Sequence, residues 1–338
     1  MNIYRPDGWI DMPRLIDRPT PFIIIVGTRQ IGKSYGSLLT MHDRGLNYIY
    51  LRRSEAALDT ITDPELSPFL ALQRDGIAEF ELRKKKKIYY IRENDEEEVR
   101  AIGVALSTFY NLRGFSARKY THIIYDEFIR DQNERPLREE FTGFMNMYMT
   151  VNSIRELQGE PPVKCILLAN SNMLLNPIFM GWGLVTVMEK MQRTGENFWE
   201  DCYRGITLIN AGDSPISERL QTTALFKSMP GSNDFSRMAL ENKYSDYETD
   251  GISPQDLKQY RPMVTVGELT IYQHKSRSQI YVTTHRSGSP EEYCTSDADL
   301  KRFQRDYFRL RLAYLNRGLL FESFICKALF EQYIGFNS

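Results

Sequence analysis

The sequence predicts an α/β fold in which a mostly parallel β-sheet is covered by helices on both faces. Three observations support this prediction. Apolar, strand-like runs alternate with helical segments up to about residue 205. A glycine-rich octapeptide follows the first of these runs, and an acidic pair follows a later one. From residue 241 the pattern changes to meander-like strands followed by helices, which predicts a small C-terminal α+β domain.

The first buried run and the helix after it enclose the glycine-rich octapeptide. The run Phe22–Val26 predicts a strand, and residues 35–44 predict a helix. Residues 27–34 between them fit the pattern G-x-x-x-x-G-K-[ST], in which backbone N–H groups and a helix N-terminus surround a phosphate chain. The sequence therefore predicts a P-loop nucleotide site formed by Gly27, Thr28, Arg29, Gln30, Ile31, Gly32, Lys33, Ser34 and Tyr35.

Two side chains of this loop have distinct expected roles. Lys33 places a positive charge at the β- and γ-phosphates of ATP, which makes it a candidate catalytic residue, and the Ser34 hydroxyl offers a ligand to Mg²⁺. The alternative interpretation is a glycine-rich turn with an exposed lysine. The strand before the loop and the helix after it favour the nucleotide site.

The rest of the N-terminal part alternates between the two kinds of element. Residues 54–75 and 139–151 are expected to be helical. Strands are expected at residues 47–51, 101–106, 121–125 and 163–169, with a hairpin over residues 79–91.

Polar residues follow two of these strands. Asp126 and Glu127 come directly after the run at 121–125, and Asn170 follows the run at 163–169. Successive side chains at a strand end point to opposite sides, so Asp126 can hold Mg²⁺ while Glu127 acts as general base on the attacking water. Asn170 is a candidate contact to the γ-phosphate or the water; the alternative is a capped turn.

A cation that stabilises the transition state is a further expectation. Arg155 follows the helix at 139–151 and could reach a neighbouring subunit's γ-phosphate as an arginine finger. Arg52, Arg53 and Arg29 are alternative candidates for this role. Arg155 could instead be a solvated arginine on the surface without a catalytic role.

The C-terminal part has a different composition and a different order of predicted elements. Residues 206–240 are rich in Gly, Ser, Pro and Asn and predict a linker with a helix around 216–228. The domain after it, residues 241–338, is expected to contain strands at 263–272 and 279–284 and helices at 299–317 and 321–333. Basic patches suited to nucleic acid or an acidic surface lie at Lys84–Lys87, around Arg113 to Lys119, and on the helix from Lys301 to Arg317.

Composition limits the function further. A length of 338 residues favours two domains. The formal net charge of −1 excludes a chain that is basic throughout, so any nucleic-acid surface must be local. The four cysteines form no C-x-x-C pair, which argues against a zinc site or a disulfide framework, and no apolar window predicts a membrane span.

The motifs together carry a family resemblance. The P-loop with Tyr35, the string from Tyr48 to Arg53, the string from Ile123 to Arg130 and the run from Cys165 to Asn170 resemble the DNA-packaging ATPase of phi29-type tailed phages in order and spacing. The resemblance covers most of the chain and is strongest in the first two hundred residues.

That resemblance implies an additional-strand, catalytic-glutamate P-loop ATPase with ATP and Mg²⁺ as cofactors. Relatives assemble as a ring, pentameric in this group, at the portal vertex of a procapsid in the host cytoplasm, and drive double-stranded DNA inward. A structural RNA is a further candidate partner. The C-terminal domain resembles a vestigial RNase H-like nuclease, so no DNA cleavage is expected.

Two other functions remain open from the residues alone. A P-loop nucleotide kinase or GTPase would share the loop, although the acidic pair favours activation of water. A nucleotide-gated binding module without turnover would also share it. Phosphate release from ATP, with and without DNA, separates these functions.

Overall fold

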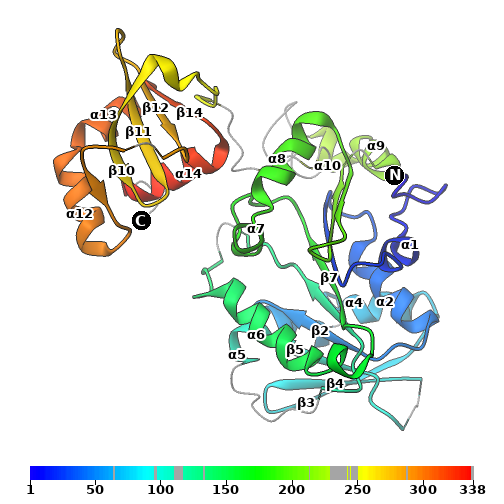
Figure 1. The fold of residues 1–338 in the computed structure, drawn as a ribbon. Coiled ribbons are helices and arrows are strands. Elements are labelled where there is room, and N and C mark those ends of the chain that lie inside the picture. The colour runs from blue at the N-terminus through cyan, green and yellow to red at the C-terminus, as the bar shows by residue number, and fades with distance from the viewer. Residues whose placement is uncertain are drawn as a thin grey trace. The chain divides into compact units, whose positions relative to one another are not determined.

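The computed structural model describes residues 1–63, 65–94, 97–109, 117–131, 134–212, 214–228, 242, 244, 250–286 and 288–335. The chain divides into two compact units, Met1–Leu184 with Lys190–Asp246, and Val185–Glu189 with Tyr247–Ser338. Each unit contains one large sheet (Figure 1).

The larger unit is built on a sheet with the order β3-β4-β5-β2-β6-β7-β1-β9-β8. Its central strands, from β5 to β9 in that order, run parallel, and antiparallel pairing occurs only toward the edges, within β3-β4-β5 and between β9 and β8. This confirms the predicted mostly parallel sheet. The strands are β1 (Phe22–Gly27), β2 (Tyr48–Arg52), β3 (Phe80–Lys85), β4 (Ile88–Glu93), β5 (Ala101–Ala105), β6 (His122–Asp126), β7 (Lys164–Ala169), β8 (Phe198–Asp201) and β9 (Ile206–Ala211).

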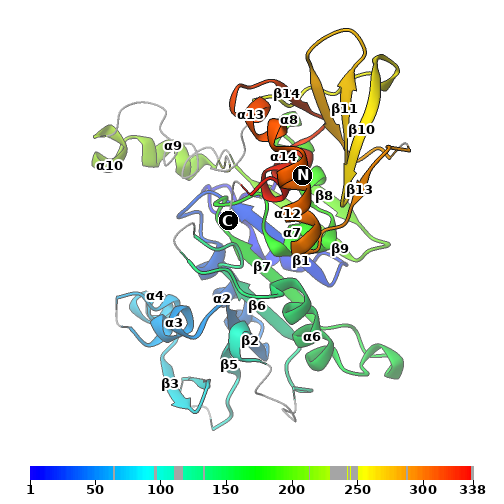
Figure 2. The ribbon, with the colours of Figure 1, turned by 90° about the vertical axis from the view of Figure 1, so that its left-hand side faces the viewer.

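Helices cover both faces of this sheet (Figures 1 and 2). On one face, Ile23 and Ile25 of β1 join a core cluster with Met12 and Leu38. On the other, Tyr125 of β6 stacks on Phe144. Burial on both faces explains why the central strands read as continuous apolar runs. The helices described between residues 1 and 228 are α1 (Met12–Ile16), α2 (Lys33–Asp43), α3 (Glu55–Asp59), α4 (Pro68–Arg74), α5 (Leu106–Phe109), α6 (Glu140–Asn152), α7 (Pro177–Trp182), α8 (Val185–Thr194), α9 (Pro215–Gln221) and α10 (Ala224–Lys227), of which Val185–Glu189 in α8 belong to the second unit.

Part of the predicted linker at 206–240 is wrong. Residues 206–211 form β9, which pairs in parallel with β1 from Phe22 to Gly27. The run is buried throughout, so its side chains belong to the core of the sheet. The helix expected around 216–228 appears as the short helices α9 and α10. Residues 229–240 of the predicted linker, and Arg113 of the predicted basic loop, lie outside the described residues.

The C-terminal unit is an α+β structure whose sheet has the order β13-β10-β11-β12-β14. A single strand predicted over 263–272 is instead a hairpin that turns at Gly267, where φ is +52°. The helix predicted over 299–317 breaks at Tyr307, whose φ of −115° is not helical. The elements are β10 (Tyr260–Val266), β11 (Leu269–His274), β12 (Ile280–Thr283), β13 (Glu292–Tyr293), β14 (Leu319–Phe321), α12 (Asp297–Asp306), α13 (Phe308–Leu315) and α14 (Phe324–Tyr333).

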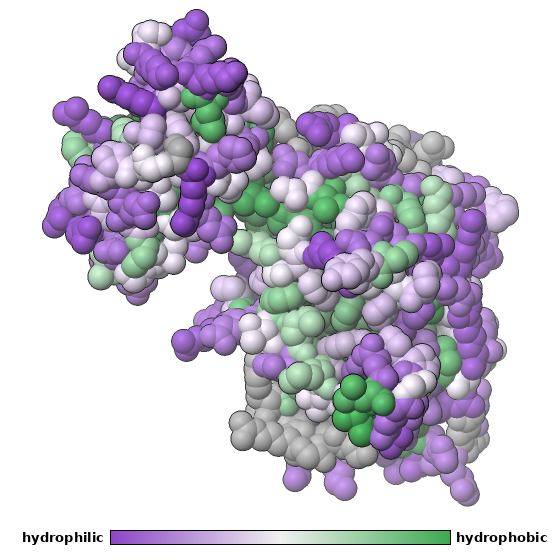
Figure 3. Space-filling model, viewed as in Figure 1, coloured by the Kyte–Doolittle hydropathy of each residue, from purple (hydrophilic) through white to green (hydrophobic). Residues whose placement is uncertain are grey.

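Hydrophilic residues cover most of the face shown in Figure 3, with apolar residues in smaller patches. Among the described residues, no helix combines the length and the hydrophobicity that crossing a membrane requires.

Candidate active site

The order of the central strands brings three loops together. Strand β7 lies between β6 and β1, with Asp126 beside Leu168 and Val26 beside Ala169. Because these strands are parallel, the residues that follow each of them meet at one edge of the sheet. The P-loop, the Asp126–Glu127 pair and Asn170 therefore share this edge.

Two glycines allow the chain to curl between β1 and α2. A Cβ atom on Gly27 would lie 2.7 Å from the Cβ of Ala211 and 2.8 Å from its carbonyl oxygen, so no larger residue fits. Gly32 is the N-cap of α2 and has a φ of +87°, in the left-handed region that glycine adopts without strain. The resulting loop directs the N-terminus of α2 toward the open edge, where an anion is favoured.

Lys33 is held inside this curl. Its side chain is buried, and Nζ donates hydrogen bonds to the carbonyl oxygens of Gly27 at 3.1 Å and Thr28 at 2.7 Å and to Oδ1 of Asn170 at 3.0 Å. Burial lowers the pKa of Lys33 to about 7. The ammonium form can satisfy all three acceptors, whereas the neutral amine cannot. A phosphate group at the loop would supply the negative charge that favours the ammonium.

Ser34 and Asp126 form a pair of oxygen donors. The Ser34 hydroxyl donates to Oδ1 of Asp126 at 2.9 Å, and the Tyr50 hydroxyl donates to Oδ2 at 2.7 Å. Adjacent oxygen ligands of octahedral Mg²⁺, each about 2.0–2.1 Å from the ion, lie roughly 2.9 Å apart. The two oxygens therefore fit the spacing of neighbouring Mg²⁺ ligands, and Tyr50 fixes the orientation of the carboxylate.

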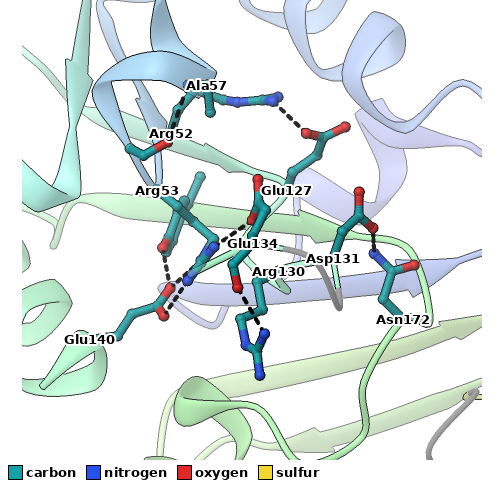
Figure 4. A network of polar contacts seen from close by, with 11 residues as sticks. Arg52, Arg53, Ala57, Glu127, Arg130, Asp131, Glu134, Glu140 and Asn172 are labelled. Atoms are coloured by element: carbon teal, nitrogen blue, oxygen red, sulfur yellow. Dashed lines mark hydrogen bonds and ion pairs between the residues drawn. The ribbon is translucent and has the colours of Figure 1, made fainter. Parts of the chain in front are cut away.

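Glu127 occupies a different environment from its neighbour. Its side chain is 57% exposed, against 5% for Asp126, and its φ is +55°. The carboxylate accepts a hydrogen bond from the guanidinium of Arg52 (Figure 4). Desolvation raises the pKa of Glu127 above its ordinary value, while Arg52 opposes that rise. A carboxylate with a raised pKa, open to solvent, suits a general base.

A pocket of about 270 Å³ lies at this edge of the sheet. Gly27 and Thr28, the first two residues of the loop, do not line it. Thr28 is buried, and its backbone N–H donates to the carbonyl oxygen of Ala211 at 3.1 Å. The lining residues are Arg29, Gln30, Ile31, Gly32, Lys33, Ser34, Tyr35, Asp126, Glu127, Ala169 and Asn170.

The candidate arginines have different surroundings. Arg52 contacts Glu127 and lies 3.6 Å from Asp126, so it belongs to the site. Arg53 is buried in a bidentate ion pair with Glu140, at 2.7 and 2.9 Å (Figure 4). Arg29 is exposed and lines the pocket.

Arg155 lies away from the pocket of its own chain. It is buried, donates to the carbonyl oxygen of Arg118 at 2.6 Å and forms an ion pair with Glu160 at 3.0 Å. Arg118 precedes β6 and Glu160 precedes β7, so these contacts lie at the amino ends of those strands, opposite the P-loop edge. Its proposed action on a neighbouring subunit stays a prediction.

The sequence interpretation missed two polar contacts near the site. Tyr50 is fully buried and orients Asp126, although it reads only as a strand residue. Asn172 donates to Asp131 at 2.5 Å beside Glu127 (Figure 4). An aromatic hydroxyl on a central strand was the only sequence signal for Tyr50, because the partner lies 76 residues away.

Comparisons with known proteins agree with this architecture. A family model described as "Podovirus DNA encapsidation protein (Gp16)" matches residues 4–255. The DNA packaging protein of Bacillus phage phi29 is 27% identical over 251 residues, which are 71% of this chain but 65% of that protein, so the match spans less than two thirds of the relative's length. The DNA packaging protein of Bacillus phage B103 is 23% identical over 90% of this chain and 94% of its own length.

A solved structure supports the same fold. The chain from "The bacteriophage Phi-29 viral genome packaging motor assembly" superposes with a TM-score of 0.66 at 18% identity, covering 96% of this chain and 99% of that one. At this identity the likeness establishes the fold. The family match, in contrast, spans most of the sequence, including every candidate site residue. The chain belongs to the podovirus DNA encapsidation protein (Gp16) family.

Proposed function

We propose that this chain is an ATP-hydrolysing motor subunit that moves double-stranded DNA into a viral procapsid. The observation that carries the proposal is the pair of carboxylates at the end of β6, where Asp126 contacts Ser34 and Glu127 faces the open pocket. Family membership and the names of the relatives, which are DNA packaging proteins, direct the proposal toward packaging.

Each side chain has a role in this proposal. The backbone N–H groups of the P-loop and the ammonium of Lys33 bind the β- and γ-phosphates of ATP. Ser34 and Asp126 hold Mg²⁺, which neutralises phosphate charge when it is bound. Glu127 accepts the proton of the attacking water. The Asn170 amide contacts the γ-phosphate in this proposal, which its hydrogen bond with Lys33 supports.

The positive charge needed in the transition state has several candidate sources. Arg52 and Arg29 are available within the chain, because both lie at the pocket or contact its carboxylates. Arg155 would act on a neighbouring subunit, and for this its guanidinium would have to leave Glu160. A role in trans requires a homo-oligomer.

The assembly and its partners follow from the family. We infer a homo-oligomeric ring, pentameric by resemblance, at the portal of a procapsid in the host cytoplasm. Double-stranded DNA is the substrate that the ring moves, and a structural RNA is a candidate partner. The C-terminal unit serves as an adaptor and does not cut DNA.

The test is phosphate release from ATP by the full chain, with and without double-stranded DNA, in parallel with oligomer mass. We expect Lys33→Ala to lose tight ATP binding. Glu127→Gln should still bind Mg·ATP and hydrolyse it at least about 10²-fold more slowly, the scale of a lost general base. Near-normal turnover by Glu127→Gln would contradict the assignment of the base, and ATP binding without turnover by the parent would indicate a binding module.

A further inference from the structure

An aromatic side chain lies against the P-loop outside the groups assigned above. The six-membered ring of Trp9 covers Gly32: a Cβ atom built on that glycine would lie 3.0 Å from Cε3 and 3.7 Å from Cζ3 of the indole. Trp9 is also 45% exposed, which is high for a tryptophan in contact with the core of a domain. One side of the indole therefore rests on the phosphate-binding loop while much of the ring is open.

The segment that carries Trp9 is fixed in place. The backbone N–H of Ile10 donates to Ile31 in the P-loop at 3.1 Å, and that of Arg5 donates to Trp9 at 2.8 Å. The carbonyl oxygen of Gly8 accepts from the Ser214 hydroxyl at 3.2 Å. The backbone on both sides of Trp9 is thus held at the loop, and this segment does not need to be ordered when a ligand binds.

A second aromatic ring borders the same part of α2. Gly32 and Tyr35 are three residues apart, so they lie on one face of the first helical turn. Tyr35 lines the pocket, and its hydroxyl donates to Asp75 at 2.6 Å. Farther along α2, Met12 packs against Gly36, so the N-terminal segment follows this face of the helix. Tyr35 therefore lines the pocket itself, and Trp9 lies next to that lining, against Gly32.

We propose that the exposed face of Trp9 stacks on the base of the bound nucleotide. This inference rests on the proposed function, since it takes the phosphates to lie at the P-loop. With the phosphates at the loop, the base would extend from the pocket past Gly32, the residue that the indole covers. Every nucleobase has a π-face, so stacking adds affinity for nucleotides and tolerates either purine.

The test compares ligands that share phosphates but differ in the base. The affinities of ATP, GTP and inorganic tripolyphosphate are measured on the full chain for the parent, Trp9→Ala and Trp9→Phe. We expect Trp9→Ala to bind ATP and GTP about 10-fold or more weakly, the scale of one lost base–aromatic stack. The same variant should bind tripolyphosphate like the parent, and Trp9→Phe should restore most of the affinity for ATP.

Intrinsic fluorescence gives an independent readout of the contact with Trp9. The chain has three tryptophans, Trp9, Trp182 and Trp199, so single replacements identify the one that responds. ATP should quench the parent and the control Trp199→Phe, but not Trp9→Phe, and tripolyphosphate should quench none of them. Equal ATP affinity in parent and Trp9→Ala, or an equal loss for tripolyphosphate, would overturn the stacking role while leaving the nucleotide site intact. A parent chain that binds neither ATP nor tripolyphosphate would instead overturn the proposed function itself.

Discussion

At the scale of single residues, the two neighbouring carboxylates after β6 show how the surroundings divide roles. Asp126 is buried, and its oxygens accept hydrogen bonds from Ser34 and Tyr50. Glu127 is largely exposed and contacts Arg52. The two hydrogen bonds fix the orientation of the Asp126 carboxylate, as a metal ligand requires. Desolvation raises the pKa of Glu127, and Arg52 opposes that rise.

The contact with Arg52 leads to a prediction about pH. Removing the guanidinium in Arg52→Gln takes away the charge that holds down the pKa of Glu127, so that pKa should rise further. A general base works only when it is ionised. The acidic limb of the pH–rate profile for ATP hydrolysis should therefore move to higher pH.

The matched control is Arg44→Gln, which removes an arginine whose ion pair with Asp17 lies outside the pocket. Its acidic limb should stay at the position of the parent. An unshifted limb in Arg52→Gln would show that Arg52 does not act on Glu127 electrostatically.

At the scale of elements, helix α2 depends on close contact with the N-terminal segment. Gly36 lies inside this helix, where alanine would ordinarily be favoured by about 1 kcal/mol. A Cβ atom there would lie 2.7 Å from Cγ and 3.2 Å from Cβ of the buried Met12. Neither atom is at the free end of the side chain, so the segment or the helix must move to admit the extra carbon.

We therefore expect Gly36→Ala to destabilise the protein despite its better helix propensity. Overpacking typically costs about 1–3 kcal/mol, which exceeds the gain in propensity. The midpoint of chemical denaturation should fall relative to the parent. Gly288→Ala is the control, because a Cβ atom at that position meets no atom within 4 Å. A raised midpoint for Gly36→Ala would mean that the segment yields without cost.

At the scale of the whole molecule, action between subunits can be tested by mixing variants. Arg155→Ala should retain ATP affinity but lose turnover by about 10³-fold if its guanidinium reaches a neighbouring site. Mixing it with Glu127→Gln should recover some activity, because each variant supplies what the other lacks. Failure to recover activity at any ratio would favour Arg52, Arg53 or no arginine finger, and would leave Arg155 with structural contacts to Arg118 and Glu160.

The C-terminal unit is expected to leave DNA uncut. A two-metal nuclease needs several carboxylates that converge on ions about 4 Å apart. Across the described residues, no group of three or more His, Cys, Asp or Glu side chains is placed to hold a metal ion. The resemblance to a vestigial nuclease leads us to expect no nicked product when the full chain is incubated with plasmid DNA and Mn²⁺. Nicking that disappears on Glu268→Ala would reveal a nuclease.

The sequence by itself determined the loop at residues 27–34, the acidic pair at the end of a strand and the parallel sheet. The octapeptide and the acidic pair are local patterns, because the loop curl and the strand end are set by adjacent residues such as Gly32 and Lys33. Buried runs such as Phe22–Val26 have no solvent face, and this identified them as central strands.

Tertiary structure alone decided which distant residues meet. The assignment of 206–211 to the sheet depended on pairing with β1, against the composition of the residues that follow. Tyr50 reaches Asp126, Arg52 reaches Glu127, and Trp9 reaches Gly32 only because separate strands and segments pack together. Such contacts depend on the order of strands and on long-range packing, which no local pattern records, so they could not be predicted from the sequence.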